Sequence, residues 1–284
     1  MALFSLLLVL FIERARLLGD RLQFEPVFAR YREVLFDEQK LKQWPYMLVA
    51  LLLPALGVHW VIQGVIGTWF GVWHLAVWIG IGLLLFGHNP LRERFRQYLV
   101  AACRGDTQAC YHYVEQLDCG QSTEDRSELS IGVHMGQIAA WLNYRYYAAV
   151  TLYFVALGPA VALFYCTVRA YHDHFAQQQL KRPLIGPLLH LLDWLPCRIV
   201  ALGFALSGHF SRAMTVLIPL ILDPFVPARS VITQVALAAE ELPANAEQEP
   251  VCVQSTMALL QLAKRNLILL LIVVSILTIL GVLA

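Results

Sequence analysis

The chain has 284 residues, of which 58% are hydrophobic and only 14% are charged, and its net charge is +1 at pH 7. An average soluble domain carries about 25% charged residues, so a soluble fold of this size would lack the polar side chains that its surface needs. The balanced charge, without a basic stripe, excludes a typical nucleic-acid-binding protein. The composition instead predicts an all-α, polytopic helical bundle in a membrane.

Residues 1–42 begin with an apolar run and continue as a charged, mainly basic segment. Nothing basic precedes the run and no small-residue cleavage site follows it, so the pattern is not that of a cleaved signal peptide. The run is also short for a membrane crossing, which needs about 20 residues. We expect an uncleaved helix that lies at the membrane interface or packs into the bundle, followed by a basic cytoplasmic segment.

Residues 43–87 are expected to form a transmembrane hairpin. No Asp, Glu, Lys or Arg occurs between Gln43 and Leu91. Two crossings of about 20 residues each fit into this stretch, near residues 46–65 and 69–87. Basic residues flank the hairpin on both sides and are missing from its turn, which places both flanks in the cytoplasm by the positive-inside rule.

Residues 88–145 form the main polar insertion, which we expect to be helical and cytoplasmic. Asn89-Pro90 is a typical helix start, and Asp106 is a suitable cap for a second helix over Thr107–Leu117. Ser122 or Thr123 would open a third helix that continues towards the next span. No alternating pattern typical of a strand is visible here.

Residues 146–222 are expected to hold a broken transmembrane span, followed by spanning or re-entrant helices. The stretch 146–168 has no charged residue, but Gly158-Pro159 predicts a kink or break within it. The stretch 188–222 contains Asp193 and Arg198, so it can enter the membrane only where protein shelters these charges.

Two further segments complete the chain. Residues 223–265 are expected to form cytoplasmic amphipathic helices and a linker, and residues 266–284 a C-terminal transmembrane span. Lys264-Arg265 just before this span places its start in the cytoplasm. The number of crossings stays open between five and four plus a re-entrant hairpin.

The motifs of common soluble enzymes are missing from the sequence. It contains no P-loop, no dinucleotide-binding glycine motif, no Gly-x-Ser-x-Gly and no His-Glu-x-x-His. The six cysteines include no Cys-x-x-Cys pair, and the two histidines of His172-Asp173-His174 would point to different faces of a helix. We therefore predict no catalytic residue, no metal site and no cofactor.

Polar residues beside or inside apolar segments are the candidates for binding. Charges at such positions need partners and often mark function, and arginines there can bind phosphate or carboxylate groups in a bidentate manner. They could equally pair with one another or face lipid headgroups. The candidates on this ground are Glu13, Asp20, Asn143, Arg145, Arg169, Asp173, Asp193 and Arg198.

Four stretches of the sequence resemble the AmpE family, and the resemblance covers essentially the whole chain. They are MALFSLLLVLFIERARLLGD, NYRYYAAVTLYFVALGP, LDWLPCRI and the final apolar span. The resemblance implies a bacterial inner-membrane protein associated with β-lactamase induction and cell-wall recycling. AmpE is in turn similar to CbiB and CobD, membrane enzymes that form an amide in cobalamin assembly.

The pattern of those enzymes is only partly kept. Asp20, Asn143 and Tyr165 stand at matching positions, and Leu195-Pro196-Cys197-Arg198 resembles their Leu-Pro-Ala-Arg, but acids of the pattern are replaced, as at His172. Amide formation with ATP needs magnesium, which is held by carboxylates. The comparison therefore adds Tyr165 to the candidate ligand-binding residues and favours a protein that is not an enzyme.

Three functions follow as hypotheses. The first is a non-catalytic membrane regulator that binds a small anionic ligand or a partner, and the second is an amide-forming ligase of the CbiB/CobD type. The third is a scaffold that holds the transmembrane helix of another protein against small-residue faces such as Gly64 and Gly67. The lipid bilayer is a partner in all three, and nucleic acid in none.

Overall fold

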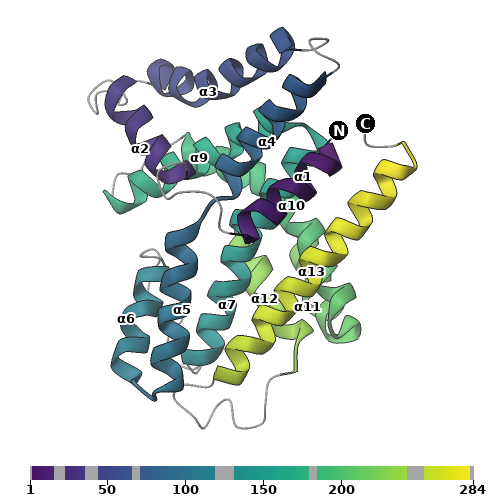
Figure 1. The fold of residues 1–284 in the computed structure, drawn as a ribbon. Coiled ribbons are helices and arrows are strands. Elements are labelled where there is room, and N and C mark those ends of the chain that lie inside the picture. Colours follow the sequence, from purple (N-terminus) through teal and green to yellow (C-terminus); the bar gives the residue numbers. More distant parts are fainter. Residues whose placement is uncertain are drawn as a thin grey trace. The chain divides into compact units, whose positions relative to one another are not determined.

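A computed structural model describes residues 2–15, 23–35, 44–65, 71–118, 131–178, 184–241 and 253–281. All regular elements in these ranges are helices, and none is a strand (Figure 1). The predicted all-α fold class is confirmed. The chain divides into two compact units: a first unit of residues 1–88, 150–189 and 274–284, and a second unit of residues 89–149 and 190–273.

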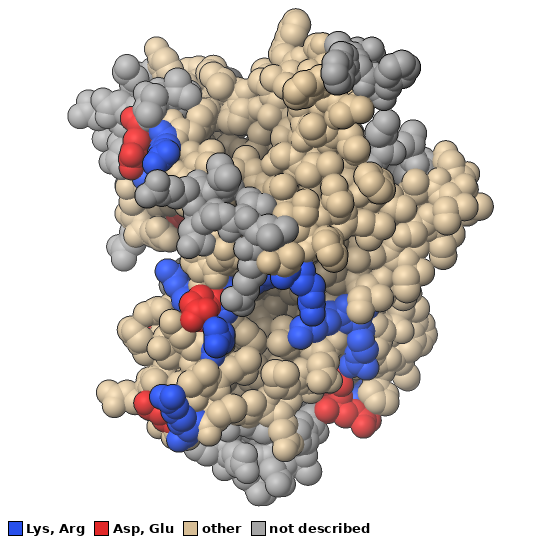
Figure 2. Space-filling model, in the orientation of Figure 1, with Lys and Arg blue, Asp and Glu red and all other residues tan. Residues whose placement is uncertain are grey.

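Four helical stretches are long and apolar enough to cross a membrane. They are Pro45–Val65, Val72–Cys103, Ile185–Ser207 and Val253–Ile279. Few side chains on the face shown in Figure 2 are charged. Large apolar side chains of these stretches, such as Leu56, Trp73 and Ile276, are more than half exposed. Exposed apolar surface on this scale needs a lipid environment. The chain is therefore built as a multi-pass membrane protein.

The first unit contains six helices in the described ranges: α1 (Ala2–Arg14), α2 (Phe24–Leu35), α3 (Trp44–Val65), α4 (Val72–Phe86), α8 (Ala149–Ala156) and α9 (Pro159–Gln177). Helix α1 packs on α4, and α3 and α4 both pack on α9. Gly82 permits the first of these contacts, because a Cβ there would lie 2.6 Å from Cγ2 of Val9. Gly80 and Gly64 face open space, and Gly67 lies outside the described residues.

The chain breaks between α8 and α9 at Gly158. This glycine has φ of 89°, a backbone conformation that L side chains rarely adopt, and Pro159 then occupies the first turn of α9. The Gly-Pro pair therefore ends one helix and starts the next, as its sequence predicts.

The second unit holds the polar insertion and the helices that pack on it. Its elements are α5 (Asn89–Cys103), α6 (Thr107–Leu117), α7 (Ile131–Asn143), a π-helix (Tyr144–Ala148), α10 (Ile185–Ser207, mostly in this unit), α11 (Phe210–Leu222), α12 (Ala228–Ala239) and most of α13 (Val253–Ile279). Asp106 caps α6 as predicted, because its side chain accepts a hydrogen bond of 3.0 Å from the Ala109 N–H. The predicted start of the third helix at Ser122 or Thr123 lies outside the described residues.

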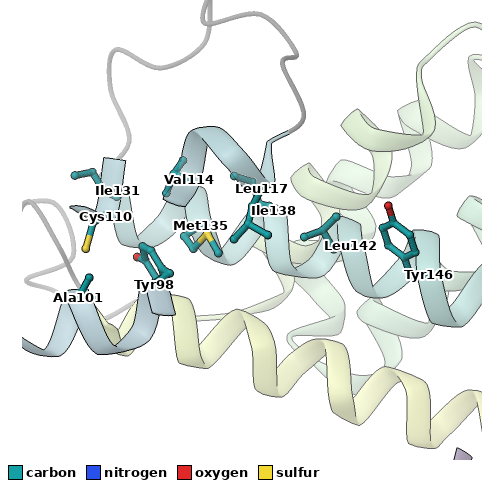
Figure 3. Close-up of a cluster of buried hydrophobic side chains, with 11 residues drawn as sticks. Tyr98, Ala101, Cys110, Val114, Leu117, Ile131, Met135, Ile138, Leu142 and Tyr146 are labelled. Carbon is teal, nitrogen blue, oxygen red and sulfur yellow. The ribbon is translucent and has the colours of Figure 1, made fainter. Parts of the chain in front are cut away.

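A buried apolar cluster joins α5, α6 and α7 (Figure 3). Tyr98 of α5, Cys110 of α6 and Met135 of α7 are each fully buried within it. The hydroxyl of Tyr98 lies 3.4 Å from that of Thr256, which donates a 2.7 Å hydrogen bond to the Gly132 carbonyl. The insertion thus has its own core, which is tied to the start of α13.

The last helix begins earlier than the apolar run that predicts it. Helix α13 begins at Val253, whereas hydropathy places the span from Asn266. The additional turns are held by packing on α7, where a Cβ at Gly136 would lie 2.5 Å from Cδ1 of Leu259. Asn266 is itself buried and donates a 3.0 Å hydrogen bond to the Val200 carbonyl of α10. Tertiary contacts therefore extend the helix beyond the apolar run.

Candidate functional site

The predicted site residues fall into both units. Asp20 lies outside the described residues. The first unit contains Glu13, Tyr165, Arg169 and Asp173, and the second contains Asn143, Arg145, Asp193 and Arg198. Of the described candidates, Asn143 and Asp173 are partly exposed and the others are buried.

Helix α9 carries three of the candidates of the first unit on one face. Tyr165, Arg169 and Asp173 are spaced four residues apart, which aligns them along a helix. The guanidinium carbon of Arg169 lies 6.0 Å from the centre of the Tyr165 ring, and Arg169 is only 2% exposed. The Tyr165 ring stacks on that of Tyr153, with centroids 5.0 Å apart. The buried Arg169 guanidinium thus lies beside an aromatic ring, and a cation in this position is stabilised by the ring, more strongly where water is excluded.

The histidines next to Asp173 make separate contacts. Asp173 Oδ1 lies 3.5 Å from Nδ1 of His172, and Nδ1 of His174 contacts Nη1 of Arg32 in α2. His172 and His174 therefore point to different partners, as expected from their spacing on a helix.

A π-helix in the second unit directly follows Asn143, contains Tyr144 and Arg145, and contacts Asp193 through Tyr144. A π-helix inserts one extra residue into a turn, and such turns are frequent at functional sites. Here the inserted turn buries both Tyr144 and Arg145 directly after Asn143. The Tyr144 hydroxyl donates a 2.8 Å hydrogen bond to Oδ1 of Asp193 in α10. We call Asn143, Tyr144, Arg145 and Asp193 the π-helix site.

Two aromatic rings, those of Trp141 and Tyr144, lie next to the charged residues of the π-helix site. The ring of Trp141 stacks on that of Tyr144, with centroids 5.3 Å apart, and lies 5.7 Å from the guanidinium carbon of Arg145. Tyr147, two residues after Arg145, accepts a 3.1 Å hydrogen bond at its hydroxyl from Nε of Arg92 in α5. Cationic and aromatic groups of this kind can hold a phosphate or carboxylate by charge and an apolar group by stacking.

Replacing Tyr144 by phenylalanine is expected to destabilise the protein by about 1–3 kcal/mol, because the buried Asp193 carboxylate loses a hydrogen-bond donor. Thermal unfolding in mild detergent measures this effect. Tyr111→Phe is the matched control, since Tyr111 is 62% exposed on α6. Equal melting temperatures for the two variants would show that the bond contributes nothing.

Arg198 contacts backbone carbonyls within the second unit. Its Nη1 donates to the Trp194 carbonyl at 3.0 Å, and its Nη2 donates to those of Leu220 at 3.3 Å and Asp223 at 2.8 Å. Its guanidinium carbon also lies 4.6 Å from the centre of the Trp194 ring. Through these contacts Arg198 stabilises the C-terminal end of α11.

A second polar cluster lies where α6, α7 and α12 meet. None of its residues is among the candidates predicted from the sequence. Asp118 has a side chain that is only 4% exposed; its Oδ1 contacts Nη2 of Arg229, and its Oδ2 lies 3.6 Å from Nε2 of His134. Burial alone would raise the pKa of Asp118, but hydrogen bonds and charge from His134 and Arg229 lower it below the usual value.

One signal in the sequence points to this second cluster. Asp118 directly follows α6, where the helix dipole disfavours a negative charge. A carboxylate at such a place needs a cation, although its partners, His134 and Arg229, are distant in sequence. We call Asp118, His134 and Arg229 the Asp118 cluster.

Comparison with known proteins agrees with this architecture. A family model described as "Regulatory signalling modulator protein AmpE" matches residues 1–284, the whole chain. The chain belongs to the AmpE family. It is 27% identical over 299 residues to "Protein AmpE" of Shigella flexneri, and the match covers 100% of both chains. No solved structure matches.

Membership of the AmpE family confirms the resemblance seen in the sequence and assigns the chain to the regulatory signalling modulators. It agrees with the four helices that are apolar and long enough to cross a membrane.

Proposed function

We propose that this AmpE family member is a non-catalytic protein of the bacterial inner membrane. It modulates β-lactamase induction within cell-wall recycling by binding a small anionic ligand or a partner protein at the π-helix site. The single observation that carries the proposal is the regulatory family match over the whole chain. The buried arginine and aspartate beside a π-helix supply the place where such binding would act.

The cost of burying charge supports a binding role for this site. Arg145 is 8% exposed and Asp193 is 5% exposed. Removing a charged group from water costs several kcal/mol of free energy, which contacts inside the protein must offset. Charged residues inside or at the edge of a membrane are therefore rare, and those that occur often mark a functional site. An arginine beside stacked rings suits an anion that also carries an apolar or planar group.

The same proposal puts most of residues 88–145 and 223–265 on the cytoplasmic side. Basic residues border both segments, as the positive-inside rule requires. The ion pair between Asp118 and Arg229 joins one segment to the other within the second unit. A regulator with this arrangement would present its polar surface to cytoplasmic partners.

Deletion and complementation test the proposed function. Removing the gene from its host is expected to change the β-lactamase activity that a β-lactam induces, and the native chain should restore it. Arg145→Gln should fail to restore it, because losing a charge-assisted hydrogen bond of about 1.5–3 kcal/mol lowers ligand affinity roughly tenfold or more. The readout is induced β-lactamase activity at equal membrane levels of the protein.

Arg96→Gln is the matched control for that experiment. The Arg96 side chain is 68% exposed on α5 and only 3.9 Å from Glu93. Its replacement should restore induction as the native chain does. Unchanged induction in the deletion strain would refute the regulatory role. Full restoration of induction by Arg145→Gln would show that the π-helix site takes no part in that role.

A further inference from the structure

Large apolar side chains are exposed around the turn between α11 and α12, residues 223–227, beside one exposed carboxylate, that of Asp223. Phe225 is 85% exposed and Leu222 is 77% exposed. Ile218 and Ile221, in the last turns of α11, are 52% and 39% exposed. Large apolar side chains that cluster at an exposed turn mark a contact surface.

Helix α11 is too short to cross a membrane. Its 13 residues span about 20 Å, whereas a hydrocarbon core of about 30 Å needs about 20 residues. Helix α11 begins just after the end of α10, and its last turn contacts Arg198 of α10, so α11 runs back beside α10. A short apolar helix placed in this way can enter a membrane without crossing it.

Helix α10, one of the four candidate spans, carries an exposed apolar stripe of its own. Its members repeat every three or four residues, so they lie along one side of the helix. They are Leu191, Leu195, Ile199, Leu202 and Leu206, with exposed fractions from 42% to 70%. Helix α10 therefore presents to the membrane a surface without charged residues.

The backbone of the turn is held by two side chains of α10. The last carbonyls of a helix have no partner inside it, and lipid cannot supply one. Arg198 donates to the carbonyls of Leu220 and Asp223, and Nε2 of His190 donates to that of Pro224 at 2.9 Å. Three carbonyl groups around the turn are thus satisfied without water.

From these observations we propose that α11 and the turn 223–227 enter the bilayer beside α10 without crossing it, with Phe225 among the acyl chains. His190 and Arg198 allow this insertion by replacing water at the carbonyl groups of the turn. The occupant of the exposed face is therefore lipid, and the proposal concerns a membrane contact that is separate from the π-helix site.

The charged groups near α11 and the turn have partners within the protein. The carboxylate of Asp223 accepts a 2.9 Å hydrogen bond from the Phe225 N–H. Arg229 pairs with Asp118 on the side of α12 that packs on α7. At the other end of α11, Arg212 lies 3.5 Å from Glu241, and both are half-exposed or more. This pattern fits a helix whose charged first turn lies at the membrane boundary and whose apolar end is directed into the membrane.

Photo-crosslinking in lipid nanodiscs tests the proposal. The photoreactive analogue p-benzoylphenylalanine replaces Phe225 in the full chain, in nanodiscs of phosphatidylcholine and phosphatidylglycerol. Mass spectrometry then counts phospholipid adducts on the acyl chains. The same analogue at Tyr111, a 62% exposed aromatic residue on α6 outside the apolar stripe, is the control. We expect several-fold more lipid adduct at position 225 than at position 111.

The outcomes separate lipid from other occupants. Equal or absent lipid adducts at the two positions would overturn the proposal, and so would adducts from position 225 to a second copy of the chain. Arg198→Lys should lower the amount of lipid adduct at position 225 several-fold, because a single ammonium group cannot donate to all the carbonyl groups that the Arg198 guanidinium contacts. If a folded Arg198→Lys protein gives the same amount of lipid adduct at position 225, Arg198 is not needed to hold the turn in the membrane.

Discussion

Replacing Asp118 by alanine is expected to destabilise the protein by about 2–4 kcal/mol, because it leaves the Arg229 guanidinium without its carboxylate. Arg229 is 22% exposed, so water offsets part of the loss. Urea unfolding in mild detergent measures the change in free energy. Glu115→Ala is the matched control, since Glu115 is an exposed acid on α6, the helix that ends just before Asp118. Similar midpoints for the two variants would contradict the structural role of the Asp118 cluster.

The same pair predicts how stability depends on pH. The pKa of Asp118 is lower in the folded protein than its usual value of about 3.9. A lowered pKa contributes stability that is fully present above the unfolded value and is lost as pH falls through the folded value. The native protein should therefore lose more stability than Asp118→Ala when the pH falls below about 4. Parallel losses in the two proteins would contradict this assignment.

Arg198→Ala is expected to destabilise the protein by about 3–5 kcal/mol, since three charge-assisted hydrogen bonds disappear and the carbonyls of Leu220 and Asp223 lose this donor. The packing of the guanidinium on Trp194 is lost as well. Thermal unfolding of protein in nanodiscs measures the effect.

Arg212→Ala is the control for Arg198→Ala. It removes an exposed arginine whose ion pair with Glu241 is expected to contribute less than about 1 kcal/mol. A comparable loss of stability in the two variants would show that the carbonyl contacts of Arg198 are unimportant.

Features that depend on neighbouring residues were predictable from the sequence. The uncharged stretch after Gln43 predicts α3 and α4, the Asp106 cap predicts α6, and Gly158-Pro159 predicts the break before α9. Each of these depends on hydropathy or on a local backbone preference, which a single stretch of sequence contains.

Features that depend on tertiary contacts were not predictable. Asp118 and Arg229 belong to distant segments and meet only because α12 packs on α7. Arg198 was a candidate for anion binding, but its donors face carbonyls of α11 that no sequence pattern places beside it. The π-helix that buries Tyr144 and Arg145 likewise has no sequence signature of its own.

A density map of the protein extracted with its native lipids would show whether the π-helix site binds a small anionic ligand or a partner group. If it does, we expect additional density against the Arg145 guanidinium that is absent from an Arg145→Gln protein prepared in the same way. A site filled only by the protein's own side chains, with identical density in the two preparations, would contradict such binding.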